Sequence, residues 1–454
     1  MATHGILLLS HCGFSFLEDL IAALESRGLR SYVLSSLPLA QHRPQRLADI
    51  GQKATRLYAT EAHELTRDDI DRTLDQLRGA GEQAIACITV WEGYRGLMAH
   101  ANAALGVPDL APAVIDALRD KLGVRNRLND AGLSGVRAQL LTPELLVRLR
   151  AGGGRYFIKP VSGIASYGAF PLRADTTWDA IQNIRNEARD DIVYRFVVNE
   201  ARDFLVEDYL AGREFSFELI VADGHVHIVG IHEKCEVTEA ASTVLEDCCT
   251  SPPHSIGRAA VAAGIAWVRA LFAHLALDWG CFHVEGRFDG DRWDLIEINP
   301  RMGGSLISHS VKALNGEHSV LELWVDLLAM HAAGHATSGR YRYLDRLAAL
   351  SYADDGAPRT DRATFFRVYF AGPGKVAQVA VRETDPAPIL SHILLKPGDE
   401  IANTAREVFL GQLLWQLTRP QRDDTLQALL RNSDGAIDIR YVQAEKLLFK
   451  SVSS

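Results

Sequence analysis

Residues 294–307, DLIEINPRMGGSLI, restrict the fold and function of the chain more than any other segment. The first half has the alternating pattern of a β-strand, which makes Glu297, Asn299 and Arg301 project from one face. A proline then ends the strand, and Gly303-Gly304 follows, where the missing side chains let a ligand approach the backbone. An acid, an amide and a guanidinium in a row beside such a turn predict a binding site.

The preceding segment, CFHVEGRF, predicts the partner strand of a hairpin, with Asp289-Gly290-Asp291 as the connection. A connection of three residues places the odd-numbered positions of both strands on one face. Glu285 therefore faces the same way as Glu297, with His283 beside it. Two carboxylates and the amide oxygen of Asn299 are hard ligands, which suit Mg²⁺ better than Zn²⁺. We predict Glu285, Glu297 and Asn299 as metal ligands.

Arg301, one strand step beyond these ligands, adds a planar fork that can bind a phosphate or carboxylate oxygen. The alternative for this hairpin is a solvated surface with its charged residues outward. The apolar residues of LIEINPR, and a glycine pair without a packing reason, argue against that alternative.

Composition argues against several other classes of protein. The chain has 454 residues, enough for about three domains, and a net charge of -9 with a pI near 6.0, which disfavours nucleic acid and membranes as partners. Six cysteines without a CxxC pair do not make a disulfide scaffold, and the N-terminus lacks a signal-peptide pattern. The apolar run AAVAAGIAWVRALFAHLAL, interrupted by Arg269 and His274, is too short for a membrane span. We expect a cytoplasmic protein.

The order of strand and helix patterns predicts three domains. Strand patterns (GILLLS, SYVLSS, AIACITV) alternate with helices over residues 1–117, which predicts an open, mostly parallel α/β domain. Residues 118–330 contain two hairpins, the first with Asp223-Gly224 as its turn. The polar segment between these hairpins, CEVTEAASTVLEDCCTSPPHS, is interpreted as irregular. Short strands and helices over residues 331–454 predict a C-terminal α+β domain.

The second hairpin resembles the metal-binding hairpin of the ATP-grasp ligases in the spacing of Glu285, Glu297 and Asn299 and in the ending NPRMGG. The resemblance implies an α/β fold class, α+β in the ligase part, with an ATP-grasp fold between an N-terminal open α/β domain and a C-terminal completing domain. It also implies that the two acids and Asn299 bind two Mg²⁺ ions on ATP, with Mn²⁺ as an alternative. Arg301 would be the catalytic cation.

An ATP site also needs a cradle for the phosphates, and the sequence offers one after the strand RYFIKP. Lys159 ends this strand, and the loop VSGIASYG follows, in which Ser162, Gly163 and Gly168 can present backbone N–H groups to phosphate. The resemblance implies that Lys121 is a further ATP-contacting lysine. The commoner nucleotide motifs fail, because neither a P-loop nor a well-placed GxGxxG occurs.

The segment LVEDYLAGREFSFE resembles the hinge over adenine in these ligases. The resemblance implies that Glu214 binds the ribose hydroxyls and that the backbone of four residues contacts the base: Glu207, Asp208, Tyr209 and Leu210. Glu214, Ser216 and Glu218 share one strand face, while the phenylalanines between them pack on the other. A plain surface strand would show the same alternation.

Within the superfamily, the chain is most similar to bacterial L-amino-acid ligases of the bacilysin-synthetase type, which make dipeptides. The similar segments are VWEGYRGLMAHANAALGVPDLAP, GIHEK, NPRMGGSLI, FFRVYFAGPGKV and LLKPGDEI. The resemblance implies that Glu246, in the loop before the long helix, faces the substrate's amino group, with Cys249 where a histidine is expected. The other substrate-binding candidates are Glu92 at a strand end, His283, Arg301 and Gly304.

The implied partners are amino acids or small carboxylic acids, and a homodimer is left open. ATP would convert the carboxylate of one substrate to an acyl phosphate, which an amine then attacks. Because acyl phosphates hydrolyse, the segments 162–168 and 232–254 are expected to close over the site.

Three alternatives remain. The first is a zinc module built from His232, Cys235, Cys248, Cys249 and His254, although vicinal cysteines do not match common finger spacings. The second is a non-catalytic ATP-binding module. The third is another ATP-grasp ligase, of the purine-pathway or carbon-dioxide-fixing type.

Overall fold

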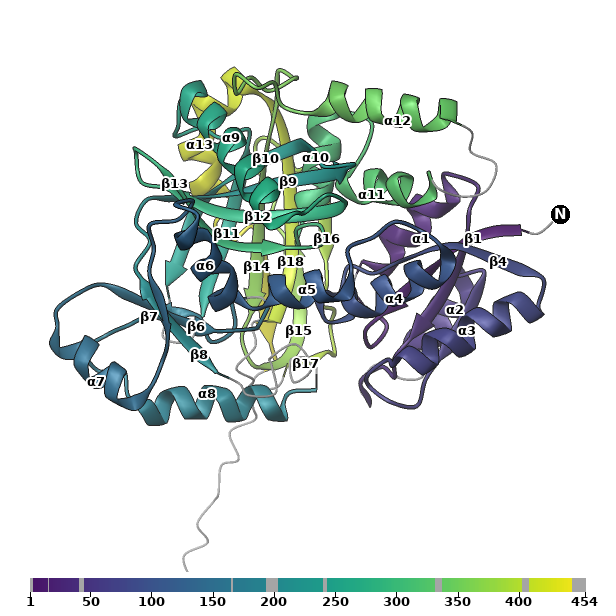
Figure 1. Ribbon diagram of the computed structural model, residues 1–454, viewed down its shortest axis with the longest axis horizontal. Coiled ribbons are helices and arrows are strands. Elements are labelled where there is room, and N and C mark those ends of the chain that lie inside the picture. Colours follow the sequence, from purple (N-terminus) through teal and green to yellow (C-terminus); the bar gives the residue numbers. More distant parts are fainter. Residues whose placement is uncertain are drawn as a thin grey trace, which may run out of the picture.

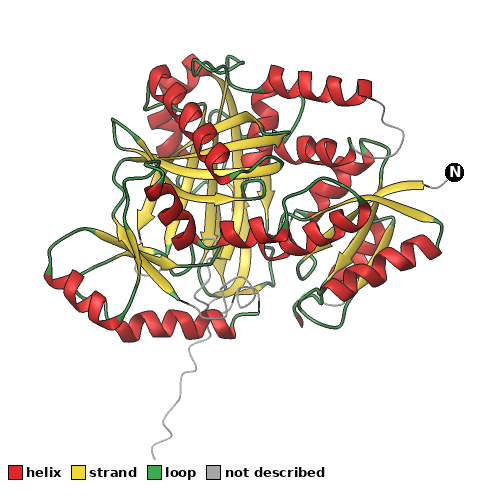
Figure 2. Ribbon diagram, viewed as in Figure 1, coloured by secondary structure: helices red, strands yellow, loops and turns green. Residues whose placement is uncertain are grey.

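The computed structural model describes residues 3–14, 16–40, 45–164, 166–192, 203–239, 243–330, 337–401 and 408–442. A parallel sheet near the N-terminus, a small sheet and a large antiparallel sheet lie side by side (Figure 1). Strands occupy the centre of the larger part, and helices cover its outside (Figure 2).

The N-terminal sheet is parallel, as predicted. Its order is β3–β2–β1–β4, with β3 at Arg56–Ala59, β2 at Arg30–Ser35, β1 at Thr3–Ser10 and β4 at Glu82–Ile88. The helices are α1 (Leu17–Glu25), α2 (Gln45–Lys53), α3 (Arg67–Gly79) and α4 (Arg95–Leu105). Residues 6–9 of β1 are buried, because helices cover both faces of such a sheet. The short β3 was not predicted, since its four residues are only partly buried and carry no apolar pattern.

Helices α5 (Pro112–Arg119) and α6 (Lys121–Asp130) lead to the small sheet. Its order is β5–β8–β6–β7, with β5 at Ala138–Leu140, β8 at Phe204–Asp208, β6 at Tyr156–Pro160 and β7 at Phe170–Pro171. Helices α7 (Pro143–Ala151) and α8 (Trp178–Asp190) complete this lobe, which has its own apolar core around Ile158 and Ile181.

The large sheet has eight antiparallel strands in the order β13–β12–β9–β10–β11–β14–β18–β16. The first five are β13 (Trp293–Asn299), β12 (Gly280–Phe288), β9 (Arg213–Ala222), β10 (His225–Glu239) and β11 (Val244–Ser251). The last three are β14 (Arg362–Ala371), β18 (Val408–Thr418) and β16 (Leu390–Ile393). The pairing of β11 with β14 thus crosses the predicted domain boundary at residue 330, and the division into three domains stays a prediction.

The remaining elements lie around the large sheet. A three-stranded sheet has the order β17–β15–β19, with β17 at Glu400–Ile401, β15 at Gly374–Val381 and β19 at Ile437–Tyr441. The helices are α9 (Arg258–Leu275), α10 (Ile307–Asn315), α11 (Val320–Ala329), α12 (Thr337–Leu350) and α13 (Arg419–Ser433).

The first predicted hairpin is confirmed, since β9 and β10 pair on either side of Asp223-Gly224. Both turn residues have positive φ angles, 51° and 75°, as a type I′ turn requires. The expected connection of the second hairpin is wrong. Strand β12 ends at Phe288 and β13 begins at Trp293, so four residues, 289–292, connect them. A β-bulge then restores the expected face, and Glu285 lies directly opposite Glu297.

The segment between the hairpins is also not irregular in its described part. Strand β10 continues to Glu239, and β11 follows at Val244–Ser251, paired with β10 on one side and β14 on the other. Its last four residues, 248–251, are all buried, because cysteine, threonine and serine are small enough for a strand covered on both faces. Glu246 therefore projects from a strand and not from a loop. Residues 240–242 lie outside the described residues.

Within the described ranges, one helix, α9, is long and apolar enough by length and composition to cross a membrane. The sequence-based expectation that this run is too short was wrong by that criterion. One face of α9 packs against the large sheet, and a packed core helix passes the same test. Gly264 lies at this contact, where a Cβ atom would be 2.8 Å from the Trp293 ring and 2.9 Å from Phe217.

We predict that Gly264→Ala lowers the free energy of unfolding, because the added methyl group overpacks the contact between α9 and the sheet. After the gain in helix propensity, the net loss should be about 1–2 kcal/mol. Gly96→Ala in α4 is the matched control, since a Cβ atom there meets nothing within 4 Å and should add stability. Urea unfolding of both variants measures the difference, and equal stability would contradict the packing described.

Candidate active site

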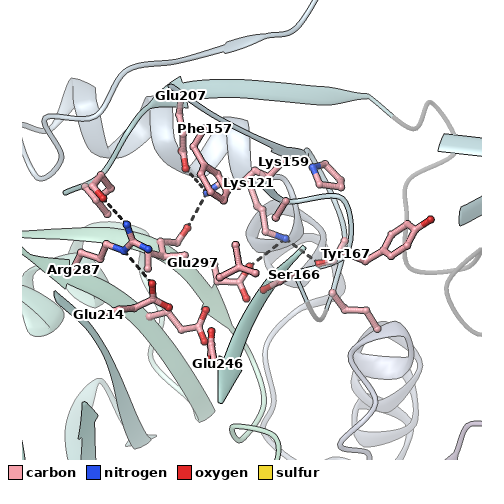
Figure 3. A pocket seen from close by; sticks show the side chains of 18 residues that line it. Lys121, Phe157, Lys159, Ser166, Tyr167, Glu207, Glu214, Glu246, Arg287 and Glu297 are labelled. Carbon is pink, nitrogen blue, oxygen red and sulfur yellow. Dashed lines mark hydrogen bonds and ion pairs between the residues drawn. The ribbon is translucent and has the colours of Figure 1, made fainter. Parts of the chain in front are cut away.

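A cleft lies between the small sheet and the large sheet, with about 740 Å³ of space that opens to solvent (Figure 3). Nine of the predicted site residues line it: Lys121, Lys159, Gly163, Glu207, Leu210, Glu214, Glu246, Glu285 and Glu297. A smaller hollow adjoins the cleft through Lys121 and Glu297, and Glu92 and Asn299 line it. Neither cavity is lined by the remaining predicted residues: Ser162, Gly168, Asp208, Tyr209, Cys249, His283, Arg301 and Gly304.

The predicted metal ligands lie together on the β12–β13 hairpin. Glu285 is paired with Glu297, and His283 with Asn299. Asn299 donates its side-chain N–H to Glu297 over 2.8 Å, which leaves the amide oxygen of Asn299 for a cation. Burial opposes ionisation of Glu285, but Lys234 and His283 outweigh it and hold the pKa of Glu285 well below its usual value. The three residues thus offer oxygen donors only, which is the set that Mg²⁺ prefers.

Two lysines reach this hairpin from the other wall. Lys121 Nζ lies 2.9 Å from the carbonyl oxygen of Gly163 and 3.3 Å from the Glu297 carboxylate. Lys159 Nζ lies 2.6 Å from Glu207 and donates to the carbonyl oxygen of Ile296, the bulge residue of β13, over 3.2 Å. Burial lowers the pKa of Lys159 although Glu207 opposes the shift.

The glycine-bearing loop fits the predicted cradle only in part. Gly163 lines the cleft, but the hydroxyl of Ser162 donates to the carbonyl oxygen of Arg119 over 3.0 Å. Gly168 has φ 73°, and a Cβ atom there would lie 3.1 Å from Ile184, so its conformation and packing explain the glycine. Ala165, in the middle of this loop, lies outside the described residues.

The hinge segment lies along the rim of the cleft. Glu207 and Leu210 line it, whereas the amides of Asp208 and Tyr209 already donate to the carbonyl oxygens of Arg137 and Arg155. Contacts with a base would therefore use the other groups of this segment. The Glu207 side chain is buried, and burial opposes its ionisation, but Lys159 and Arg125 outweigh this effect and lower its pKa.

Arg287 was not predicted, and it braces the hinge against the large sheet. Its guanidinium lies 3.0 Å from Glu214 and donates to the carbonyl oxygen of Leu210 over 2.7 Å. The acidic neighbour raises the pKa of Arg287 although burial opposes the shift. Glu214, the predicted ribose ligand, is thus held in the cleft by a cation on each side, because Lys234 Nζ lies 2.8 Å from its other oxygen. Figure 3 shows Arg287, Glu214 and Glu246 on the same wall of the cleft.

Lys234 is the largest omission of the sequence reasoning. Its buried ammonium contacts Glu246 and lies 2.8 Å from both Glu214 and Glu285. These three glutamates are close enough together for one cation, and the lysine supplies its charge. Burial, with Glu285 and Glu214 nearby, raises the pKa of Glu246 to about 8 in spite of Lys234. The GIHEK segment is part of the resemblance, but its lysine can be placed only with the register of β10 in hand.

The predicted catalytic residue, Arg301, contacts the N-terminal part of the chain. Arg301 donates to Glu92 over 3.0 Å and to the carbonyl oxygen of Met302 over 2.9 Å. The preceding turn is fixed by Arg95, which is 1% exposed and donates to the carbonyl oxygen of Pro300 over 2.6 Å. Arg95 also forms an ion pair of 2.7 Å with Asp109. The segment VWEGYR thus contacts Pro300 and Arg301 through two of its side chains, Arg95 and Glu92.

Two of the other substrate candidates, Cys249 and Gly304, line neither cavity. Cys249 is 4% exposed and packs with Leu306 and Phe366 in an apolar cluster. A Cβ atom at Gly304 would meet nothing within 4 Å, so this glycine leaves open space beside the turn. Gly303 differs, because a Cβ atom there would be 2.8 Å from His283 Nδ1. The expectation that the glycine pair has no packing reason was therefore wrong for Gly303.

A sequence profile of the ATP-grasp domain matches residues 155–309, a range that begins just before Lys159 and ends after the NPRMGG turn. The chain contains an ATP-grasp domain. The match includes the hinge, Lys234 and the metal hairpin, whereas Glu92 and Lys121 precede it.

Similar proteins agree with this placement. Carnosine synthase 1 of Gallus gallus is 24% identical over 288 residues, which are 58% of this chain and 29% of that protein. The chain thus spans less than a third of the curated relative. An L-amino acid ligase from Bacillus licheniformis has a TM-score of 0.69 at 17% identity, with 98% of this chain and 100% of that chain covered. Phosphoribosylglycinamide synthetase from Anaerococcus prevotii has a TM-score of 0.64 at 13% identity, with 97% and 100% covered.

The expected ATP-grasp fold is confirmed by the domain match and by these structures. The zinc alternative is not supported. In the described part of the chain, the group of side chains that could share an ion is Glu214, Glu246 and Glu285, and no histidine or cysteine belongs to it. His232 instead lies 2.9 Å from the hydroxyl of Ser310.

Burial lowers the pKa of His232 to about 4, so the ATP-grasp domain holds it neutral. The unfolded chain takes up this proton near pH 6.5, and the folded chain takes it up only near pH 4. The stability that His232 contributes is therefore present above pH 6.5 and is lost as the pH falls through this window.

We predict that His232→Gln reduces this pH dependence by up to about 3 kcal/mol between pH 7 and pH 4. The amide can still bond to Ser310, so the variant should fold. His225→Gln, at an exposed histidine of the same strand, is the control. Urea unfolding at several pH values measures the effect, and parallel profiles for wild type and His232→Gln would show that His232 is not the group responsible.

Proposed function

We propose that the protein is an ATP-dependent carboxylate–amine ligase, which joins an amino acid or similar carboxylic acid to an amine or a second amino acid. The observation that carries the proposal is the cleft, which is lined by Lys121 and Lys159 and by the acid pair Glu285 and Glu297. Lys121 lies 3.3 Å from Glu297, and the buried Lys234, behind the cleft wall, lies 2.8 Å from Glu285. Cations placed around a pair of oxygen ligands are what the triphosphate of a metal-bound nucleotide needs.

The metal site of this proposal consists of Glu285, Glu297 and Asn299. Their oxygen donors and their cross-strand pairing fit Mg²⁺, with two ions and with Mn²⁺ as a substitute. When bound, the metal neutralises charge on the phosphate oxygens and orients them. Lys121, at the start of α6, and Lys159, on β6, would hold phosphate oxygens, while Glu214 would take the ribose hydroxyls once the nucleotide is bound.

The reaction has two steps. The carboxylate of the first substrate attacks the γ-phosphorus of ATP, an oxygen–phosphorus bond forms, and ADP leaves. The amine of the second substrate then attacks the acyl carbon, phosphate leaves with the bonding electrons, and the amine loses a proton. Both steps place negative charge near the hairpin, where Lys234 and Arg301 can offset it. The cytoplasm suits this chemistry, and the six cysteines are free thiols.

Within this class, we propose formation of dipeptides from L-amino acids. The structural likeness to the Bacillus licheniformis L-amino acid ligase, which extends over 98% of this chain, supports the choice. Glu246 is the candidate for the ammonium group of the first substrate, because it is the acid at the mouth of the Lys234 cluster with 29% of its side chain exposed. Glu92 and Gly304 remain candidates for the second substrate.

The decisive experiment is a screen of phosphate release with Mg²⁺ and ATP against all pairs of amino acids and small carboxylic acids. We expect release only with a productive pair, and a product with the summed mass of the two substrates less one water. Glu297→Gln serves as the inactive control. Turnover that requires bicarbonate or a phosphoribosyl amine, and not an amino acid, would identify another ATP-grasp ligase instead.

Arg301 is predicted to act on the acyl phosphate more than on ATP. Arg301→Lys keeps the charge but loses the planar fork, so kcat should fall on the order of 10²–10³-fold. Binding of a non-hydrolysable ATP analogue should change far less. Arg292→Lys, at the exposed turn of the same hairpin, is the matched control. Analogue binding that falls in proportion to kcat would make Arg301 a nucleotide-holding residue.

A further inference from the structure

Glu218 is a buried acid that the mechanism above does not use. It lies on β9, on the strand face that also carries Glu214 and Ser216, but it is 0% exposed and lines neither cavity. A carboxylate without contact to water costs several kcal/mol unless its oxygens are paired. Its partners therefore indicate what the residue is for.

Both oxygens of Glu218 have partners that lead to the hairpin. One oxygen lies 2.7 Å from His283 Nδ1 and 3.0 Å from the hydroxyl of Ser216. The other accepts the backbone N–H of Gly303 over 3.3 Å. Glu218 thus contacts both β12, the strand that carries Glu285, and the turn after Arg301.

His283 connects Glu218 to Glu285, a residue of the proposed metal site. Its Nε2 lies 2.9 Å from Glu285, so the ring stands between two carboxylates, with one ring nitrogen within hydrogen-bond distance of each. A metal-binding carboxylate is usually oriented by such outer partners. Here the partner is itself oriented by an acid that substrate does not reach.

The second contact explains why a glycine follows the catalytic arginine. A Cβ atom at Gly303 would lie 2.8 Å from His283 Nδ1 and 3.1 Å from the Glu218 carboxylate. The turn therefore comes to rest against the Glu218–His283 pair, and its amide is fixed there. Arg301 and Gly304 flank this fixed point.

We propose that Glu218 is a positioning residue that orients the metal ligand Glu285 through His283 and anchors the turn after Arg301 through Gly303. The inference rests on the proposed function, because it takes Glu285 as a ligand of the nucleotide's metal. It adds a residue that touches neither substrate nor metal but sets where both the ligand and the arginine lie.

Mn²⁺ binding in the presence of a non-hydrolysable ATP analogue tests this without any turnover. The fraction of free Mn²⁺, read from its electron paramagnetic resonance signal, gives the dissociation constant for the metal. Loss of an outer partner of this kind typically weakens metal binding by about 10- to 100-fold. We expect this loss for Glu218→Gln, which keeps the shape of the side chain but not its charge.

Two further variants make the result specific. His283→Gln should weaken Mn²⁺ binding to the same extent, and the double variant should be little worse than either single one, because both changes break one chain of contacts. Ser216→Ala is the control, since it removes a bond to the same carboxylate without touching His283, and Mn²⁺ binding should be retained. The KM for the amine substrate should move less than the Mg²⁺ concentration needed for half activity.

The outcomes are distinguishable. If Glu218→Gln folds and binds Mn²⁺ as wild type does, the positioning role is overturned while the proposed function stands. If Glu218→Gln does not fold, His283→Gln decides, and unchanged Mn²⁺ binding in that variant overturns the role as well. If wild type itself binds no Mn²⁺ with the analogue, the proposed function fails together with this inference.

Discussion

A single buried ammonium ties together four adjacent strands of the large sheet. Lys234 comes from β10, and its three acidic partners, Glu214, Glu246 and Glu285, come from β9, β11 and β12. Buried charges of this kind add little net stability, but each must be paired. A slip of any one strand by a single residue would turn its charge to the apolar face. The register of this wall of the cleft is therefore set by charge pairing as much as by its apolar core.

The sequence predicted the acids of the site but not the cation between them, and β-bulges are the reason. Without a bulge, the two-residue turn at Asp223-Gly224 would pair Lys234 with Arg213, on the face of the buried phenylalanines. A bulge near residue 229 shifts the register by one and places Lys234 opposite Glu214. In the β12–β13 hairpin, the connection is one residue longer than predicted, and a bulge that was not predicted compensates for this shift. Glu285 and Glu297 therefore share a face as predicted. Local patterns carry no signal for such an extra residue.

The resemblance to a known superfamily predicted the fold, the hinge segment and the metal-binding hairpin, because the hinge and the hairpin are motifs with fixed spacing. Contacts between distant segments were not predictable in this way. The pairing of Cys248 with Arg367 joins residues that no local pattern relates, so β11 was predicted to be irregular. The same holds for Arg95, whose bond to the carbonyl oxygen of Pro300 connects the N-terminal part of the chain to the turn before Arg301 across 205 residues.

The central position of β11 has a consequence for any exchange of the segment after residue 330. Residues 248–251 of β11 are paired with β14, and this pairing begins two positions after Glu246. A recombination breakpoint near residue 330 would replace β14 while keeping β11, and any mismatch in their register would be felt at Glu246 within one or two strand steps. The C-terminal segment is thus coupled to the wall of the cleft that carries Glu246.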